Sequence, residues 1–293
     1  MTKSVAQSLL YLLGEDRRTV VADWRIRVLL LRHSVDSPCA TDARSVARQI
    51  TGMLQRHELT TIPLCHGIYR VNVPFAKSLP CPEEAIAQEC NPSSYLSYAN
   101  AFAYHNLTYE LPLELQYVSV PKMSLTPVGT TPDDWAGEPS PPNRTPTAIG
   151  ERNVRWGQSK SAVGIQVGRI EGLPVYVSDL ERTLIDSLRF PENCGGVSVT
   201  LKAWQNARQL IRLDRIVEYA NAMGINLLKQ RLGFVLEELD FTHPQFEEWA
   251  ASATRGSSAK LVAPRAFSST FSERWSLSIN ATEMELALLK ESK

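Results

Sequence analysis

The segment SDLERTLIDSLRFPENCGG, from Ser178 to Gly196, is the most sharply delimited helix signal in this sequence. Ser178 is predicted to cap the helix, and Glu181, three residues later, would complete a capping box. Aliphatic residues recur at helical spacing, at Leu180, Leu184, Ile185 and Leu188. Pro191 and the Gly195 and Gly196 pair stop the helix and turn the chain. The pattern predicts a helix that packs one face against a core.

Length and composition allow two folded domains. The chain has 293 residues, of which 43% are hydrophobic. Its 31 basic and 31 acidic residues give a formal net charge of zero, so any argument for nucleic acid or membrane must be local. We find no apolar run of about 18 residues and no secretory signal pattern, and we expect a cytoplasmic protein. The five cysteines are scattered without a C-x-x-C pair, so neither a disulfide framework nor a zinc site is expected.

Residues 1–76 are predicted to form a basic module of helices followed by a hairpin. Amphipathic patterns indicate helices at about residues 5–13, 20–31 and 41–56. Two β-prone runs follow, at 59–65 and 68–73, and glycine between them permits a tight turn. This order predicts a winged helix-turn-helix. Ten basic and six acidic residues give the module a local balance of plus four.

The third predicted helix, residues 41–56, has an apolar face and a polar face when drawn at about 100° per residue. The apolar arc holds Ala43, Val46, Ala47, Ile50, Met53 and Leu54. The polar arc holds Thr41, Arg44, Ser45, Arg48, Gln49, Gln55 and Arg56. Arginine can bind guanine and glutamine can pair with adenine, while either can contact phosphate. We expect this arc to face the major groove of DNA, with His66 and Arg70 of the hairpin at the backbone or minor groove; the alternative is an ordinary solvated face.

The rest of the chain is predicted to form an α+β domain. Residues 77–92 contain three prolines and few periodic apolar positions, which is typical of a linker. A helix capped by Ser93 or Ser94 and strands at about 115–120, 147–156, 162–169 and 174–177 indicate a mixed sheet. Seven prolines between residues 121 and 146 predict a long surface loop. Later helices are expected at about 197–211, 214–223, 227–239 and 244–252, with a strand at 274–280. The predicted organisation is a winged helix-turn-helix domain (1–76), a linker (77–92) and a mixed-sheet domain with a helical carboxyl-terminal half (93–293).

Several segments of the chain resemble AbiEi-type antitoxins, the regulatory halves of type IV toxin-antitoxin pairs. The segment ERTLIDSL, which contains Glu181, Arg182 and Asp186, is similar to the central signature of the antitoxin domain. Four further segments are similar to the end of the wing, the helix that opens the second domain, a late helix and the closing strand: GIYRVNVP (67–74), YLSYANAFAYHNLT (95–108), RLGFVLEEL (231–239) and RWSLSIN (274–280).

The resemblance implies an antitoxin that represses its own operon by binding promoter DNA through the amino-terminal domain. Repeated sites in the promoter would favour two protein molecules on one operator. The functional partner implied is a nucleotidyltransferase toxin, which such antitoxins oppose without forming a stable complex. The second domain is the part associated with that neutralising role.

The acidic residues of the signature segment favour architecture over catalysis. Glu181 and Asp186 lie about 140° apart around a helix, which does not suit a shared proton, whereas Arg182 and Asp186 are spaced to pair. The histidines have no metal-ligand spacing, and phosphate-loop and nucleophile-elbow motifs are absent, so we expect no cofactor, metal or catalytic residue. Two alternatives stay open. One is an enzyme acting on nucleic acid, which would bring Glu171, Asp179 and Asp186 together; the other is a DNA-binding regulator without a toxin.

Overall fold

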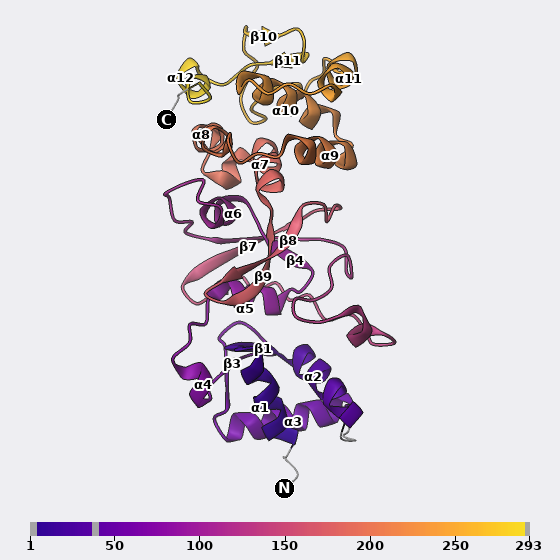
Figure 1. Cartoon of the computed structure of the whole chain (residues 1–293). Helices are drawn as coiled ribbons and strands as arrows, with labels where there is room; N and C mark the ends of the chain where they lie inside the picture. Colours follow the sequence, from indigo (N-terminus) through magenta and orange to yellow (C-terminus); the bar gives the residue numbers. More distant parts are fainter. Residues whose placement is uncertain (1–4, 37–40, 291–293) are drawn as a thin grey trace. The chain divides into compact units, whose positions relative to one another are not determined.

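The computed structural model describes residues 5–36 and 41–290, and its elements are labelled in Figure 1. The chain forms two compact units. The first comprises residues 1–96, 113–162 and 167–176, and the second comprises 97–112, 163–166 and 177–293. Both helices and a mixed sheet are present, so the α+β class predicted from the sequence is confirmed. Among the described residues, every helix is too short or too polar to cross a membrane.

The amino-terminal part of the first unit combines helices with a small antiparallel sheet (Figure 1). Its elements are α1 (Val5–Glu15), β1 (Val20–Ala22), α2 (Asp23–Asp36), α3 (Ala43–Gln55), β2 (Leu59–Thr61) and β3 (Ile68–Val71). The strand order is β1-β3-β2. One core lies between them, built from residues such as Leu13, Ile26, Leu30, Ile50 and Met53. The predicted helix over residues 20–31 is wrong at its start, because Val20 and Val21 pair with Arg70 and Tyr69 of β3.

The segment expected to be a linker contains packed helices. Residues 74–77 form the single turn α4 (Pro74–Lys77), and α5 (Glu83–Cys90) follows with its last six residues buried. The carboxylate of Glu89, which is 3% exposed, accepts a hydrogen bond from the backbone of Ala22 at 3.0 Å and pairs with Arg25 at 2.7 Å. The prolines delimit α5 instead of forming a spacer, since Pro82 precedes its first turn, where proline is well tolerated.

A mixed six-stranded sheet follows, and it confirms the mixed sheet predicted from the sequence. Its strands are β4 (Ser94–Leu96), β5 (Leu115–Ser119), β6 (Ala148–Ile149), β7 (Arg152–Gln158), β8 (Ile165–Ile170) and β9 (Leu173–Ser178). The order is β6-β7-β5-β4-β9-β8, with β5 and β7 parallel and β4 antiparallel to β5. Residues 94–96, expected in a helix, instead pair with β5, and the helix starts later as α6 (Tyr98–Tyr104). The proline-rich segment contains only the short 3-10 helix η1 (Pro132–Trp135).

The second unit contains the predicted helical carboxyl-terminal half. Its further elements are α7 (Leu180–Arg189), the 3-10 helix η2 (Pro191–Cys194), α8 (Val197–Ala207), α9 (Leu213–Met223), α10 (Asn226–Glu238), α11 (Gln245–Ala251), β10 (Phe271–Ser272), β11 (Leu277–Ser278) and α12 (Glu283–Ala287). The core surrounds three tryptophans, Trp204, Trp249 and Trp275, each at most 2% exposed. The strand predicted at 274–280 is reduced to β11, because Arg274 to Ser276 form a turn before it.

Candidate nucleic-acid interface

Asp42 is the N-cap of helix α3. The Asp42 carboxylate accepts hydrogen bonds from the backbone N–H groups of Arg44 at 2.9 Å and Ser45 at 3.2 Å. The Ser45 hydroxyl donates to the same carboxylate at 2.8 Å. These bonds hold the pKa of Asp42 below its usual value, so the cap stays ionised near neutral pH. Ser45 therefore serves the cap, which restrains its hydroxyl from other contacts.

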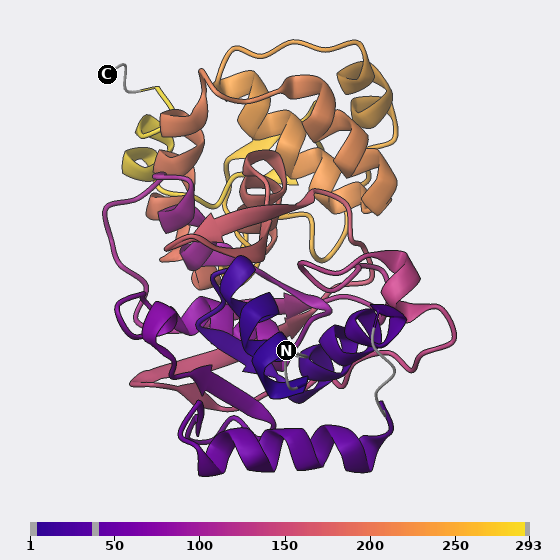
Figure 2. The same cartoon turned by 60° about the horizontal axis from the view of Figure 1, so that its bottom comes forward.

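A row of polar side chains runs along the exposed side of α3. Arg44, Arg48, Thr51 and Gln55 are exposed and follow the spacing i, i+4, i+7 and i+11, which places them within about 60° of one another. We call these four residues the α3 stripe. The opposite side carries the buried Val46, Ile50 and Met53. Figure 2 shows α3 as a straight helix along the border of the first unit, with one side turned away from the rest of that unit. Thr51 was not among the predicted contact residues, although its spacing from Arg44 and Arg48 in the sequence indicates it.

The other predicted residues of this helix lie off the stripe. Thr41 and Gln49 are half-buried, and Arg56 forms an ion pair with Glu58 at 2.8 Å. Ala43 and Ala47, predicted on the apolar face, are exposed. They lie on the flank of the helix where its apolar and polar arcs meet, and the small side chains leave that flank open.

The hairpin after α3 presents two of the predicted residues to solvent. His66 lies in the turn and Arg70 lies on β3, opposite Thr60 of β2; both side chains are exposed. The turn is shaped by Gly67, which has φ of 74° and whose missing side chain leaves room for the Asp23 carboxylate. Cys65, just before the turn tip, is buried and anchors the hairpin.

The free positive charge of this region is concentrated on few side chains. Four arginines near the start of the chain are neutralised within the first unit: Arg18 and Arg25 by Glu89, Arg27 by Glu138 and Arg32 by Asp134. Within residues 5–36 and 41–76, ion pairs with described residues are lacking for Arg17, Arg44, Arg48 and Arg70. The net positive charge of this region therefore lies mainly on the α3 stripe and the hairpin. Guanidinium groups placed in this way can bind phosphates or guanine edges.

The signature segment of the second unit is a buried ionic cluster, and its predicted cap is wrong. Asp179, not Ser178, caps α7 by accepting from the backbone of Arg182 at 2.8 Å. Ser178 is the last residue of β9, and its hydroxyl shares a hydrogen bond with Thr183. Glu181 completes no capping box because its fully buried carboxylate instead accepts from Arg212, at 3.0 Å from the backbone nitrogen.

Arg182 and Asp186 form the ion pair that their spacing predicted, and both are buried. The Arg182 Nε lies 2.7 Å from Asp186 Oδ2, and a second guanidinium nitrogen donates to the carbonyl of Val163 at 2.7 Å. Arg231 of α10 lies at the other end of the helix and donates to the carbonyl of Leu188 at 3.1 Å. Burial lowers the pKa of Arg231 to about 10. These contacts make the signature side chains a framework that fixes α7 within its unit.

The acidic residues of the enzyme alternative each have partners of their own. Asp179 accepts from the Tyr219 hydroxyl at 2.7 Å. Burial, together with this hydrogen bond, raises the pKa of Tyr219 to about 12. Asp186 is held by Arg182, whereas Glu171 belongs to the first unit and is exposed. His105 lies beside the same cluster and contacts the Ser178 carbonyl at 2.7 Å, and burial lowers its pKa. Over the described residues, clusters of His, Cys, Asp and Glu suited to a metal are not found.

Comparison with known proteins gives a likeness of fold. The sequence matches no family model, and it matches no curated protein. Its structure is similar to the crystal structure of the RV2827C protein from Mycobacterium tuberculosis, with a TM-score of 0.55 and 13% sequence identity. The alignment covers 99% of this chain and 96% of that one. The fold is thus shared over nearly the whole length of both chains.

Proposed function

We propose that this protein is a DNA-binding transcriptional repressor of the AbiEi antitoxin type, and that its amino-terminal module is a winged helix-turn-helix. The observation that carries the proposal is the α3 stripe, with its two exposed arginines, followed by an antiparallel hairpin on which His66 and Arg70 are exposed. The element order from α1 to β3 and the strand order β1-β3-β2 support the winged assignment.

In the proposed mechanism, α3 lies in the major groove of promoter DNA. From Arg44 to Gln55 the stripe extends about 16 Å along the helix, which suits contacts to several successive base pairs. Arg48 and Gln55 are placed to reach base edges or phosphates, and His66 and Arg70 of the hairpin would contact the backbone beside them. Paired repeats would seat two copies of the chain on one operator.

The antitoxin role is proposed for the second unit, on the basis of the signature segment. The side chains that resemble the family signature are those that fix α7, since Glu181 binds Arg212 and Arg182 binds Asp186. In this proposal they preserve the shape of the neutralising unit and do not perform chemistry. The partner opposed would be a nucleotidyltransferase toxin, without a stable complex between the two proteins.

Footprinting on the DNA upstream of the protein's own reading frame tests the repressor proposal. Protection of paired repeats is expected at protein concentrations that leave random DNA of equal length unprotected. Equal protection of both DNAs, or of neither, would overturn it.

Co-expression tests the antitoxin proposal separately. The full-length chain should restore growth to cells that express an adjacent nucleotidyltransferase, and the full-length R44A/R48A variant should restore it equally well while failing to repress the promoter. A wild-type chain that represses without restoring growth would leave a regulator that has no antitoxin role.

A further inference from the structure

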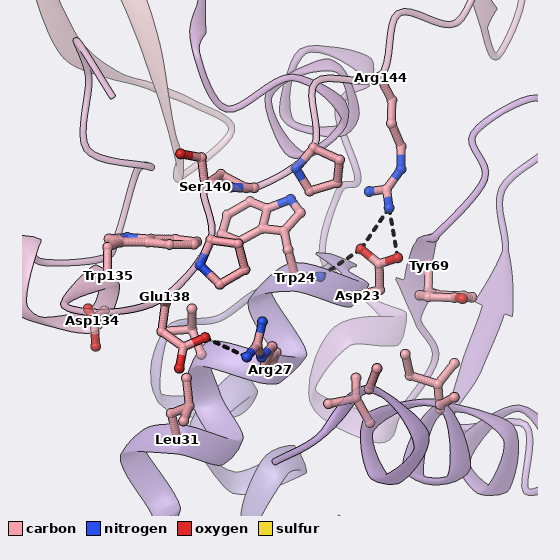
Figure 3. A pocket seen from close by; sticks show the side chains of 18 of the residues that line it. Asp23, Trp24, Arg27, Leu31, Tyr69, Asp134, Trp135, Glu138, Ser140 and Arg144 are labelled. Atoms are coloured by element: carbon pink, nitrogen blue, oxygen red, sulfur yellow. Dashed lines mark hydrogen bonds and ion pairs between the residues drawn. The ribbon is translucent and has the colours of Figure 1, made fainter. Parts of the chain in front are cut away.

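A groove opens between α2, α3 and the proline-rich segment of the first unit (Figure 3). Its volume is about 480 Å³, which lies within the range of small-molecule sites in proteins. Helix α3 forms one wall through Ala43, Ala47, Thr51 and Leu54, next to the arginines of the α3 stripe. The opposite wall belongs to residues 134–144, eighty or more positions further along the chain.

Aromatic rings form the inner part of the groove. Trp24 and Trp135 lie side by side with ring centroids 5.9 Å apart, and Tyr69 lies at the other side of the opening (Figure 3). The polar edges of both indoles are satisfied by the protein, since Trp24 Nε1 donates to the Glu89 carbonyl at 3.0 Å and Trp135 Nε1 to the Thr130 hydroxyl at 2.9 Å. The rings are therefore fixed in place, and what they offer to an occupant is apolar surface and stacking.

The charged residues that line the groove neutralise one another. Asp23 pairs with Arg144 at 2.7 Å, and Arg27 pairs with Glu138 at 2.5 Å (Figure 3). Asp134 is paired with Arg32 of α2 at 2.7 Å. A charged occupant would lose its hydration without gaining a counter-charge, so the groove is matched to an uncharged one.

We propose that this groove is an effector site for an uncharged aromatic small molecule, and that its occupancy is coupled to DNA binding by α3. The coupling rests on the proposed function, whereas the binding itself does not. An occupant in contact with Ala47 and Thr51 would pack directly against the helix that carries Arg48, and so would change how firmly α3 is held. Because such coupling is reciprocal, DNA would change the affinity for the occupant by the same factor.

The binding half is tested by titrating the full-length chain with 5-fluoroindole and following its fluorine resonance by NMR. Saturable binding is expected, weakened at least tenfold in Ala47→Trp, where the new ring fills the groove. Ala222→Trp places the same ring on an exposed position of α9 in the second unit and should leave binding unchanged. The charged analogue 5-fluoroindole-2-carboxylate should bind at least tenfold more weakly. An unsaturable signal, equal binding by Ala47→Trp, or equal binding of the charged analogue would overturn the assignment.

The coupling half is tested by measuring operator affinity with and without saturating 5-fluoroindole. At least a threefold change is expected in the wild-type chain and in Ala222→Trp, and none in Ala47→Trp. If the probe binds while the chain binds no DNA, the proposed function fails and the groove assignment stands. If the chain binds its operator but not the probe, the groove assignment fails alone. Probe binding without a change in operator affinity would contradict the coupling.

Discussion

Arg182 and Asp186 form an ion pair one turn apart in α7, with side chains only 1% and 4% exposed. Removing Arg182 would leave the buried Asp186 carboxylate with only the longer contact to Arg189, at 3.4 Å. Breaking a buried ion pair in this way costs about 3–5 kcal/mol. We predict that Arg182→Met lowers the free energy of unfolding of the second unit by roughly that amount, and that the double change Arg182→Met with Asp186→Leu recovers most of it. Urea titration followed by circular dichroism measures both.

An exposed pair provides the control for this prediction. Arg208 and Asp240 lie 2.9 Å apart, with side chains 36% and 82% exposed. Arg208→Met should cost less than about 1 kcal/mol, as is usual for surface pairs. If Arg182→Met proved as mild as Arg208→Met, the signature pair would have no structural role.

Gly233 of α10 is predicted to tolerate no side chain. A Cβ atom there would collide with the ring of Trp275, which is 1% exposed and fixed by its Nε1 donating to Glu237 at 2.6 Å. We expect Gly233→Ala to destabilise the second unit by about 1–3 kcal/mol, the usual cost of overpacking. Gly256→Ala is the matched control, because open space surrounds that residue. Thermal unfolding that is identical for the two variants would contradict the packing described for Trp275.

Asp134 ties the proline-rich segment to α2, and its charge makes that contact sensitive to pH. Its hydrogen bonds with the Arg32 guanidinium, at 2.8 and 2.7 Å, lower the pKa of Asp134 to about 2 from an ordinary value of about 3.8. A pKa that is depressed in the folded state means that the stabilisation is present above pH 4 and is lost as the pH falls towards 2.

Asp134→Asn should therefore lower the melting temperature at pH 5–7, and the difference from wild type should shrink steadily between pH 4 and pH 2. Differential scanning fluorimetry over that range provides the measurement. The neighbouring Asp133 is exposed, and Asp133→Asn should show no such trend. A difference that persisted unchanged at pH 2 would rule out the Arg32 contact as its cause.

Much of the second unit could be predicted from periodicity. The helices α7, α8, α9, α10 and α11 begin within about two residues of their predicted starts, because apolar positions recur along them and turn residues separate them. The cap of α7 could not be assigned, since Ser178 and Asp179 are both good caps and the choice depends on where β9 ends.

The wrong predictions for the first unit concern elements whose position depends on contacts between residues distant in sequence. Strand β1 has three residues, too few for a periodic signal, and it is specified by pairing with β3 nearly fifty positions later. Helix α5 owes its place to Glu89, whose partners Arg18 and Arg25 lie more than sixty positions earlier. Within the candidate site, helical spacing predicted Arg44, Arg48 and Gln55 of the α3 stripe but missed Thr51. The groove could not be predicted, because one of its walls belongs to the proline-rich segment, whose position the sequence does not indicate.

The proposed binding of DNA by the α3 stripe is tested most directly by the salt dependence of operator affinity. The R44A/R48A variant removes the two exposed arginines of the stripe. The control, R208A/R255A, removes two positive charges from exposed ion pairs of the second unit and so changes the net charge equally. Circular dichroism establishes that all three chains are folded.

Affinity for the protein's own promoter is then measured by gel shift at salt concentrations from about 50 to 200 mM. We predict that R44A/R48A binds at least tenfold more weakly and that its plot of log affinity against log salt is shallower by about two, since each phosphate contact contributes about 0.9 to the slope. The control should match the wild type. An R44A/R48A variant that is folded and keeps both the affinity and the slope of the wild type would contradict the account.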